Sequence, residues 1–153
     1  MGKISYADFG RLRLSSFFPV GTEIAPLEDW EFMDCSWVGE AIGFTEFLRL
    51  WNDPKVTRSI SIDFTEIPAS AAEAILIELA LPLRSGMNST EVSANLDAEV
   101  CSTSVFDPRR FTHDFVWGSD DPFEISCTFE DTVGLVYLVI MRPDYLTVTQ
   151  DPS

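Results

Sequence analysis

The chain has 153 residues, of which 46% are hydrophobic and 23% charged, so it can build one well-buried core and intrinsic disorder is excluded. Its 25 acidic residues against 10 Lys and Arg give a net charge of -15, which repels a phosphate backbone and excludes nucleic acid as a partner. No apolar run is long enough to cross a bilayer and the N-terminus lacks a signal-peptide core, so we expect a cytoplasmic protein that does not bind membranes.

The first part of the chain, residues 1–68, reads as strand-rich with one helix. Turn residues bound two strand-like runs, Arg11 to Phe18 and Trp30 to Val38. The helix is predicted over 44–51, because its apolar residues recur at i, i+3, i+4 and i+7, and Pro54 would end it. These apolar residues are Phe44, Phe47, Leu48 and Trp51.

Between Arg58 and Glu66 apolar and polar residues alternate, which predicts a half-buried strand. A second helix follows Pro68 and runs to Leu81, with a capping box from Ser70 to Glu73.

A third helix has the most specific start signal in the chain. Asn88 can accept a hydrogen bond from the helix and Glu91 can reach back to the N–H of Asn88. Met87 and Val92 occupy the two positions of a hydrophobic staple. The sequence therefore predicts a helix from Ser89 to about Leu96.

Four strand-like runs joined by short turns complete the chain and predict an antiparallel meander. In the runs from Phe111 and Phe123, one face is aromatic or apolar and the other hydrophilic. The two preceding helices are expected to cover the aromatic face, with Phe111, Phe115, Ile125 and Phe129 facing them and Glu124 and Thr128 outside. The runs are Val100 to Phe106, Phe111 to Trp117, Phe123 to Glu130 and Leu135 to Met141.

The expected fold is a single α+β domain over 1–153, an antiparallel meander sheet covered on one face by helices. Residues 69–146 supply two helices and the four-stranded meander, and the sequence contains no internal repeat.

The stretch Gly86-Met87-Asn88-Ser89-Thr90-Glu91-Val92, followed by Leu96, resembles the helix start in the helix-helix-four-strand unit of beta-lactamase inhibitory proteins and BamE/SmpA-like domains. The resemblance covers roughly Ala69 to Asp144. Asp97 stands where that family usually has Gly, and the chain lacks the lipid-attachment Cys of the lipoprotein branch. The resemblance implies a small scaffold whose sheet presents a surface to another protein.

No catalytic residue, metal ligand set or cofactor motif is predicted. His113, the only histidine, falls on the aromatic face and is expected to be a partly buried core residue. Cys35, Cys101 and Cys127 form an odd set without a CxxC pair, so we expect free thiols in a reducing compartment. The acids Asp114, Asp120, Asp121 and Glu124 match no calcium loop and are expected to form a solvated turn.

Aromatic and acidic positions alternate near residue 30, which suggests an acidic surface with aromatic anchors. The leading hypothesis is a non-enzymatic, bacterial-type immunity or inhibitor protein that masks a basic toxin or enzyme. One alternative is a small enzyme or ligand-binding domain with a pocket near His113; another is a structural or oligomeric subunit. The candidate partner-binding residues are Trp30, Trp37, Glu28, Asp29, Glu31 and Asp34.

Overall fold

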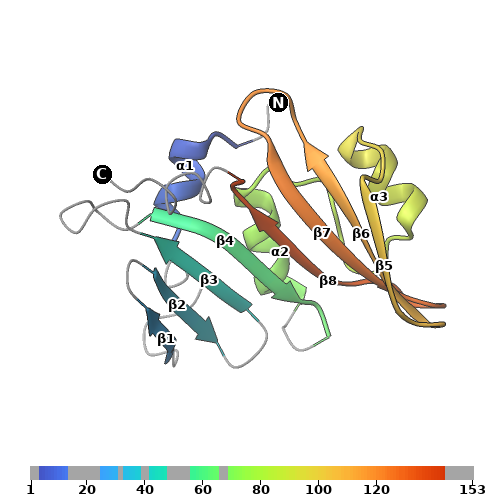
Figure 1. The fold of residues 1–153 in the computed structure, drawn as a ribbon, viewed down its shortest axis with the longest axis horizontal. Helices are drawn as coiled ribbons and strands as arrows, with labels where there is room; N and C mark the ends of the chain where they lie inside the picture. The colour runs from blue at the N-terminus through green and yellow to red at the C-terminus, as the bar shows by residue number, and fades with distance from the viewer. Residues whose placement is uncertain are drawn as a thin grey trace.

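The chain forms an α+β fold built on one antiparallel sheet, as expected (Figure 1). A computed structural model describes residues 4–13, 25–30, 33–38, 42–47, 56–65 and 69–143. The helices are α1 (Tyr6–Arg11), α2 (Ala69–Glu78) and α3 (Ser89–Leu96). The strands are β1 (Ala25–Trp30), β2 (Met33–Val38), β3 (Ile42–Phe47), β4 (Val56–Asp63), β5 (Ser102–Asp107), β6 (Arg110–Trp117), β7 (Phe123–Glu130) and β8 (Gly134–Met141).

The sheet has eight strands in the order β1-β2-β3-β4-β8-β7-β6-β5, and every neighbouring pair is antiparallel. It therefore consists of two four-stranded meanders that join through their last strands, β4 and β8. The centre of this junction pairs Ser61 with Val139. Read inward from either edge, the strands of each meander follow one another in chain order, β1 to β4 from one edge and β5 to β8 from the other. An approximate two-fold axis through the β4–β8 ladder would produce this order. The expected four-stranded meander is thus one half of a continuous eight-stranded sheet.

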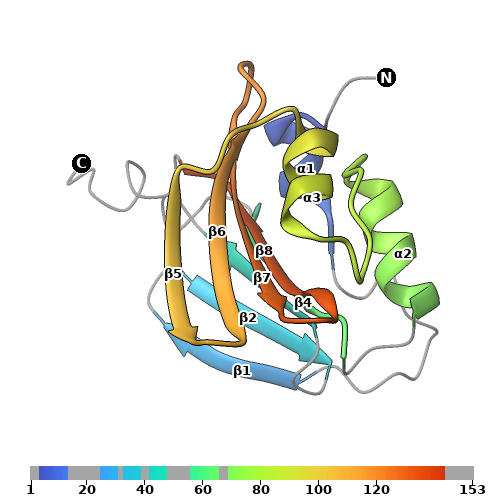
Figure 2. The same ribbon diagram turned by 90° about the vertical axis from the view of Figure 1, so that its right-hand side faces the viewer.

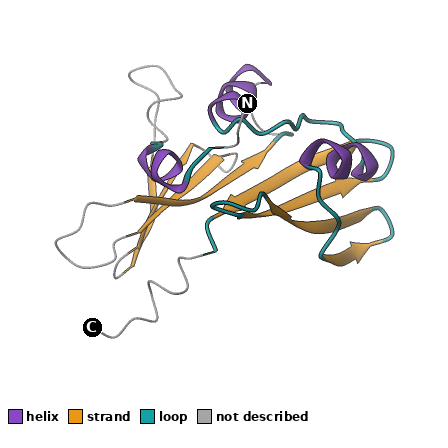
Figure 3. Cartoon of the chain, turned by 90° about the horizontal axis from the view of Figure 1, so that it is seen from above, coloured by secondary structure: helices purple, strands orange, loops and turns teal. Residues whose placement is uncertain are grey.

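All three helices lie on the same side of the sheet (Figures 2 and 3). The core lies between these two layers, and three of the four residues expected to face the helices, Phe115, Ile125 and Phe129, are buried in it. The fourth, Phe111, is partly buried against the same cluster. The helices contribute Ile75 and Leu76 from α2 and Val92 and Leu96 from α3.

The start of α3 confirms the predicted capping box. The backbone N–H of Glu91 donates to Oδ1 of Asn88 at 2.8 Å, and the N–H of Asn88 donates to Oε1 of Glu91 at 3.1 Å. Met87 and Val92 are both buried, as a staple requires. At the other end Asp97 adopts the left-handed conformation, with φ 51° and ψ 48°, at the position where Gly would be favoured.

Helix α2 begins at Ala69, so Ser70 lies inside the helix and the predicted capping box from Ser70 to Glu73 is wrong. The helix ends in a Schellman motif: the N–H of Ala80 donates to the carbonyl of Ile77, and that of Leu81 to the carbonyl of Leu76. Ala80 has φ 53° there, a conformation that disfavours any residue with a Cβ.

The predicted helix over 44–51 is wrong, because residues 42–47 form β3 and residues 48–55 lie outside the described part of the chain. Strand register explains the misleading spacing. Phe44 pairs with Ser36 and Phe47 with Met33, so the two Phe positions fall on opposite faces of β3. A strand with apolar residues on both faces can mimic the i, i+3 spacing of a helix.

The two strands predicted near the N-terminus also need correction. The run from Trp30 to Val38 is not one strand: Trp30 ends β1, Met33–Val38 is β2, and Trp30 pairs with Met33 in antiparallel register. Of the run from Arg11 to Phe18, Arg11 ends α1 and residues 14–18 lie outside the described residues. Helix α1 starts from Ser5, whose hydroxyl accepts from the N–H of Asp8 at 3.2 Å.

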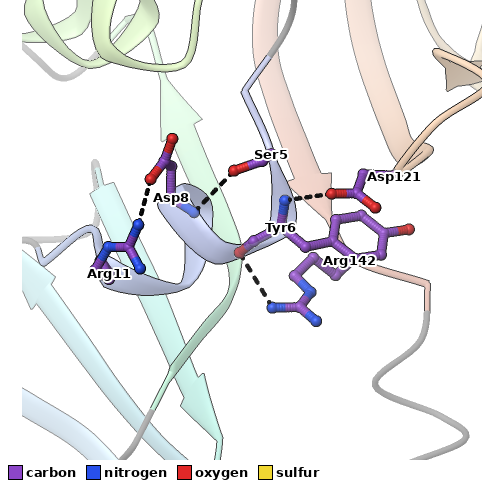
Figure 4. A network of polar contacts seen from close by, with 6 residues as sticks. All are labelled: Ser5, Tyr6, Asp8, Arg11, Asp121 and Arg142. Atoms are coloured by element: carbon purple, nitrogen blue, oxygen red, sulfur yellow. Dashed lines mark hydrogen bonds and ion pairs between the residues drawn. The ribbon is translucent and has the colours of Figure 1, made fainter.

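Helix α1 attaches the N-terminal segment to the C-terminal meander (Figure 4). The N–H of Tyr6 donates to Oδ2 of Asp121 at 2.8 Å, its carbonyl accepts from Arg142 at 3.3 Å, and its hydroxyl donates to the carbonyl of Pro122. Phe9 is fully buried, 4.9 Å from the ring of Phe123. These contacts hold α1 against the C-terminal meander.

Candidate protein-binding surface

The three helices cover one face of the sheet and leave the opposite face without a covering layer of helices. We call this opposite side the helix-free face. Figures 2 and 3 together show that the middle of the sheet lies closest to the helices and that both edges bend away from them. The sheet therefore curves around its helix-free side. A continuous, curved face of this kind can contact a convex partner over many strands at once.

Register identifies the residues of this face. Ser102, Asp114, Ser126, Val139 and Ser61 are consecutive partners across β5, β6, β7, β8 and β4. The row continues in backbone register to Gly43, Trp37 and Ala25 on β3, β2 and β1.

The centre of the face is apolar. On β8 the side chains of Tyr137, Val139 and Met141 alternate with buried core residues and are each only partly buried. Val116 on β6 is 47% exposed. Large apolar groups that remain partly exposed on an open sheet face are typical of interface anchors.

The border of the face is acidic. Asp63, Asp114, Glu124 and Glu130 occupy positions on it, and Arg110, opposite Glu130, is the sole basic residue at such a position on β4 to β8. Hydroxyl groups fill most of the remaining positions. Thr128 is only 6% exposed, and its Oγ1 lies 2.8 Å from Oγ1 of Thr112 in a cross-strand hydrogen bond.

Asp114 has the most defined geometry on this face. Its Oδ1 accepts a hydrogen bond from Ser126 on β7 at 2.6 Å, and its Oδ2 accepts one from Ser102 on β5 at 2.5 Å. Strands on both sides therefore hold this carboxylate in one orientation. Among the described residues no cation lies within ion-pair distance of it.

The residues predicted to bind a partner lie on the hairpin of β1 and β2, at one edge of the sheet, except Glu31, which lies outside the described residues. Backbone register places the positions of Trp30 and Trp37 on the helix-free side, in line with Met33 and Ser61. The positions of Asp29 and Asp34 pair with each other on the helix side. Glu28 lies in the bulge between them and Pro26. The structure thus divides the predicted patch between the two faces.

His113 lies on the helix side of β6, among aromatic rings, as expected. Its ring centre is 4.9 Å from that of Phe111 and 5.7 Å from that of Phe129, and its Nδ1 is buried without a hydrogen-bond partner. Burial lowers the pKa of His113, against a smaller opposing effect of the Asp114 charge. The imidazole is therefore neutral at neutral pH and faces a hydrophobic environment.

The thiols differ in environment. Cys127 is fully buried, and burial, helped by the charge of Asp114, raises its pKa to about 12. Such a thiol is a poor nucleophile because the thiolate is absent at neutral pH. Cys101 is exposed, and the side chain of Cys35 is not described. Within the described ranges no group of three or more His, Cys, Asp or Glu side chains could hold a metal ion.

The helix side carries an open groove of about 730 Å³ along α2. Leu76, Leu81 and Leu83 form its buried floor and Ile77, 70% exposed, stands beside it. Two further hollows, of about 340 and 860 Å³, lie at the start and the end of α3. His113 lines none of these three.

The sequence missed the residues of the helix-free face on β4 to β8 as site candidates, although alternation in β6 and β7 had placed Asp114 and Ser126 on the hydrophilic side. The missing signal was the junction of β4 with β8, which brings the two meanders side by side. No helix in the described part of the chain is long and apolar enough to span a membrane. Comparison with protein-family models, with curated proteins and with solved structures finds no match to this chain.

Proposed function

We propose that this protein is a non-enzymatic binding module that masks a basic protein, such as a toxin or an enzyme, with the helix-free face of its sheet. The observation that carries the proposal is the partly exposed apolar centre of that face, Tyr137, Val139 and Met141, within an acidic and hydroxyl-rich border. An apolar centre supplies affinity, and an acidic border supplies steering toward positive charge.

The net charge of -15 supports the same proposal. It accelerates association with a basic partner, and the acceleration falls as salt shortens the Debye length to about 8 Å at physiological ionic strength. Charge alone attracts many basic proteins weakly, so selectivity requires anchors. Trp30 and Trp37, whose backbone positions lie on the helix-free side of β1 and β2, are the candidate anchors at that edge of the sheet.

The proposal is tested by affinity capture from native lysate at low salt, followed by binding kinetics with the captured protein. We expect the association rate to fall steeply with added salt. Replacing Trp30 or Trp37 with Ala should raise the dissociation rate and leave that salt dependence unchanged. Reversing the charges of Glu28 and Asp29 should mainly slow association. Recovery of no basic partner, or a salt-independent association rate, would contradict the proposal.

No observation favours a pocket around His113. The imidazole packs among Phe rings and lines none of the three hollows described above. We expect that replacing His113 with Ala leaves partner binding intact in the folded protein.

A further inference from the structure

We infer that Asp114 and its two hydroxyl partners form a preorganised receptor for an arginine side chain of the basic partner. The inference rests on the proposed function and assigns one contact within it. Three adjacent strands supply the receptor: Ser102 from β5, Asp114 from β6 and Ser126 from β7, which are direct partners in the register. It lies on the helix-free face and includes none of the residues predicted from sequence to bind a partner. Asp114, which the sequence predicted to lie in a solvated turn, instead lies within β6.

The hydrogen-bond directions determine what the row formed by Ser102, Asp114 and Ser126 can bind. Both hydroxyl protons are used, because Ser102 donates to Oδ2 and Ser126 donates to Oδ1 of Asp114. The carboxylate has no proton to offer, so the row presents only acceptor lone pairs outward. A phosphate or a carboxylate ligand would meet no donor there and would be repelled by the Asp114 charge. The receptor therefore selects a group that only donates.

At neutral pH, where histidine is mostly neutral, the side chains that are cations with donors only are Lys and Arg, and the shape of the row distinguishes them. Its four oxygens come from three strands and form a row in which the two carboxylate oxygens lie between the two hydroxyl oxygens, 2.5 and 2.6 Å away. An ammonium group is a compact point charge and reaches one part of such a row. A planar guanidinium has five N–H donors in a fixed fork and can engage both carboxylate oxygens at once. Arginine fits this arrangement better than lysine.

The surroundings favour occupation by a partner's cation. Among the described residues the carboxylate of Asp114 has no ion-pair partner, and Arg110, the basic residue on the same face of β6, lies opposite Glu130 four positions away. Val116, 47% exposed, is two positions along the same face of β6, and Val139 is next in the row after Ser126. These apolar side chains can contact the aliphatic stem of an arginine.

The test uses two peptide probes of equal charge, tri-arginine amide and tri-lysine amide, titrated separately into the isotope-labelled protein and followed by NMR. We expect tri-arginine to shift the amide resonances of Ser102, Asp114 and Ser126 and to bind about fivefold more tightly than tri-lysine. Equal affinities, or shifts spread evenly over the acidic surface, would overturn the inference.

Two variants separate the receptor from general acidity. Asp114→Asn should abolish the preference for arginine, whereas Glu124→Gln, which removes the same charge from an exposed position on the same face, should retain it. The double variant Ser102→Ala with Ser126→Ala keeps the net charge but removes both hydrogen bonds that orient the Asp114 carboxylate. It should therefore lower the preference for tri-arginine over tri-lysine without weakening the overall attraction of the protein for both peptides. It also keeps the test valid if Asp114→Asn fails to fold. An unchanged preference in that double variant would contradict a preorganised receptor.

The peptide titrations can fail without the failure of the proposed function. If the peptides show no preference but a captured partner still depends on the helix-free face, the arginine receptor is wrong and the binding module remains. If no protein partner exists, the receptor can still be measured with the peptides.

Discussion

Gly134, at the start of β8, has no room for a side chain. It has φ +95°, and a Cβ there would lie 2.3 Å from the carbonyl oxygen of Gly86 and 2.6 Å from its carbonyl carbon. The close approach arises because the loop before α3 pairs with β8: Gly86 donates to the carbonyl of Leu135, and Leu135 donates to that of Met87. The three nearest atoms all belong to the backbone of Gly86 and Met87, so no flexible side chain can move aside to make room for a Cβ.

We therefore expect Gly134→Ala to destabilise the fold by several kcal/mol or to prevent folding. Gly86→Ala is the matched control, because Gly86 also has a positive φ, +86°, but its Cβ would meet nothing closer than 3.7 Å. That variant should cost about 1 kcal/mol from backbone strain alone. Urea unfolding of both variants measures the difference, and equal losses would show that the close approach is not present.

Cys127 and Cys101 should differ in reactivity for a physical reason. Burial raises the pKa of Cys127 from 9.0 to about 12, so the folded protein holds the thiol proton where an unfolded chain releases it. This contribution to stability is present below about pH 9 and is lost as the pH rises toward 12. In a Cys35→Ser background at pH 8, a disulfide reagent should modify Cys101 rapidly and Cys127 only after unfolding. Rapid modification of both thiols in the folded protein would contradict the buried environment.

At the scale of elements, the start of α3 rests on the capping box. Asn88→Ala removes the acceptor for the Glu91 N–H and should lower the free energy of unfolding by about 1 kcal/mol. Ser89→Ala is the control, because Ser89 is the first residue of the helix and no cap hydrogen bond involves its side chain. Thermal and urea unfolding compare the two, and equal losses would mean that Asn88 is not the cap.

How well sequence predicted each element depended on how local its signal is. The capping box of α3 and the alternation of β7 lie within a few residues, and both were confirmed. β3 is an interior strand, paired on both sides with β2 and β4, and has apolar positions on both faces, so its spacing mimicked a helix. Helix α1 has only six residues, and its burial depends on Phe123, more than a hundred residues away. Such long-range packing cannot be predicted from local periodicity.

The same distinction applies to the candidate site. Alternation placed Asp114 and Ser126 together on the hydrophilic face, because adjacent strands of a hairpin have a register that short turns determine. The pairing of β4 with β8 joins residues 78 positions apart, Ser61 and Val139, and no local pattern encodes it. The aromatic and acidic run near Trp30 gave a strong composition signal, but the hairpin divides its positions between the two faces.

The proposed function requires the two faces of the molecule to differ in partner binding, although acidic residues lie on both. The helix-free face combines an apolar centre with Asp114, Glu124 and Glu130. The helix side carries Glu73 and Glu78, both exposed, beside the groove along α2. A binding mechanism based on net charge would not distinguish these sets, whereas a defined surface would.

The most direct test of the central claim therefore compares two double charge reversals of equal net effect. Glu124→Lys with Glu130→Lys alters the helix-free face, and Glu73→Lys with Glu78→Lys alters the helix side. Affinity for the captured basic partner, measured by calorimetry at physiological salt, should fall by at least about tenfold for the first pair and by much less for the second. Equal losses of affinity in the two double variants would show that the interaction depends on net charge alone. A larger loss of affinity for the helix-side pair would place the binding surface at the groove along α2 instead.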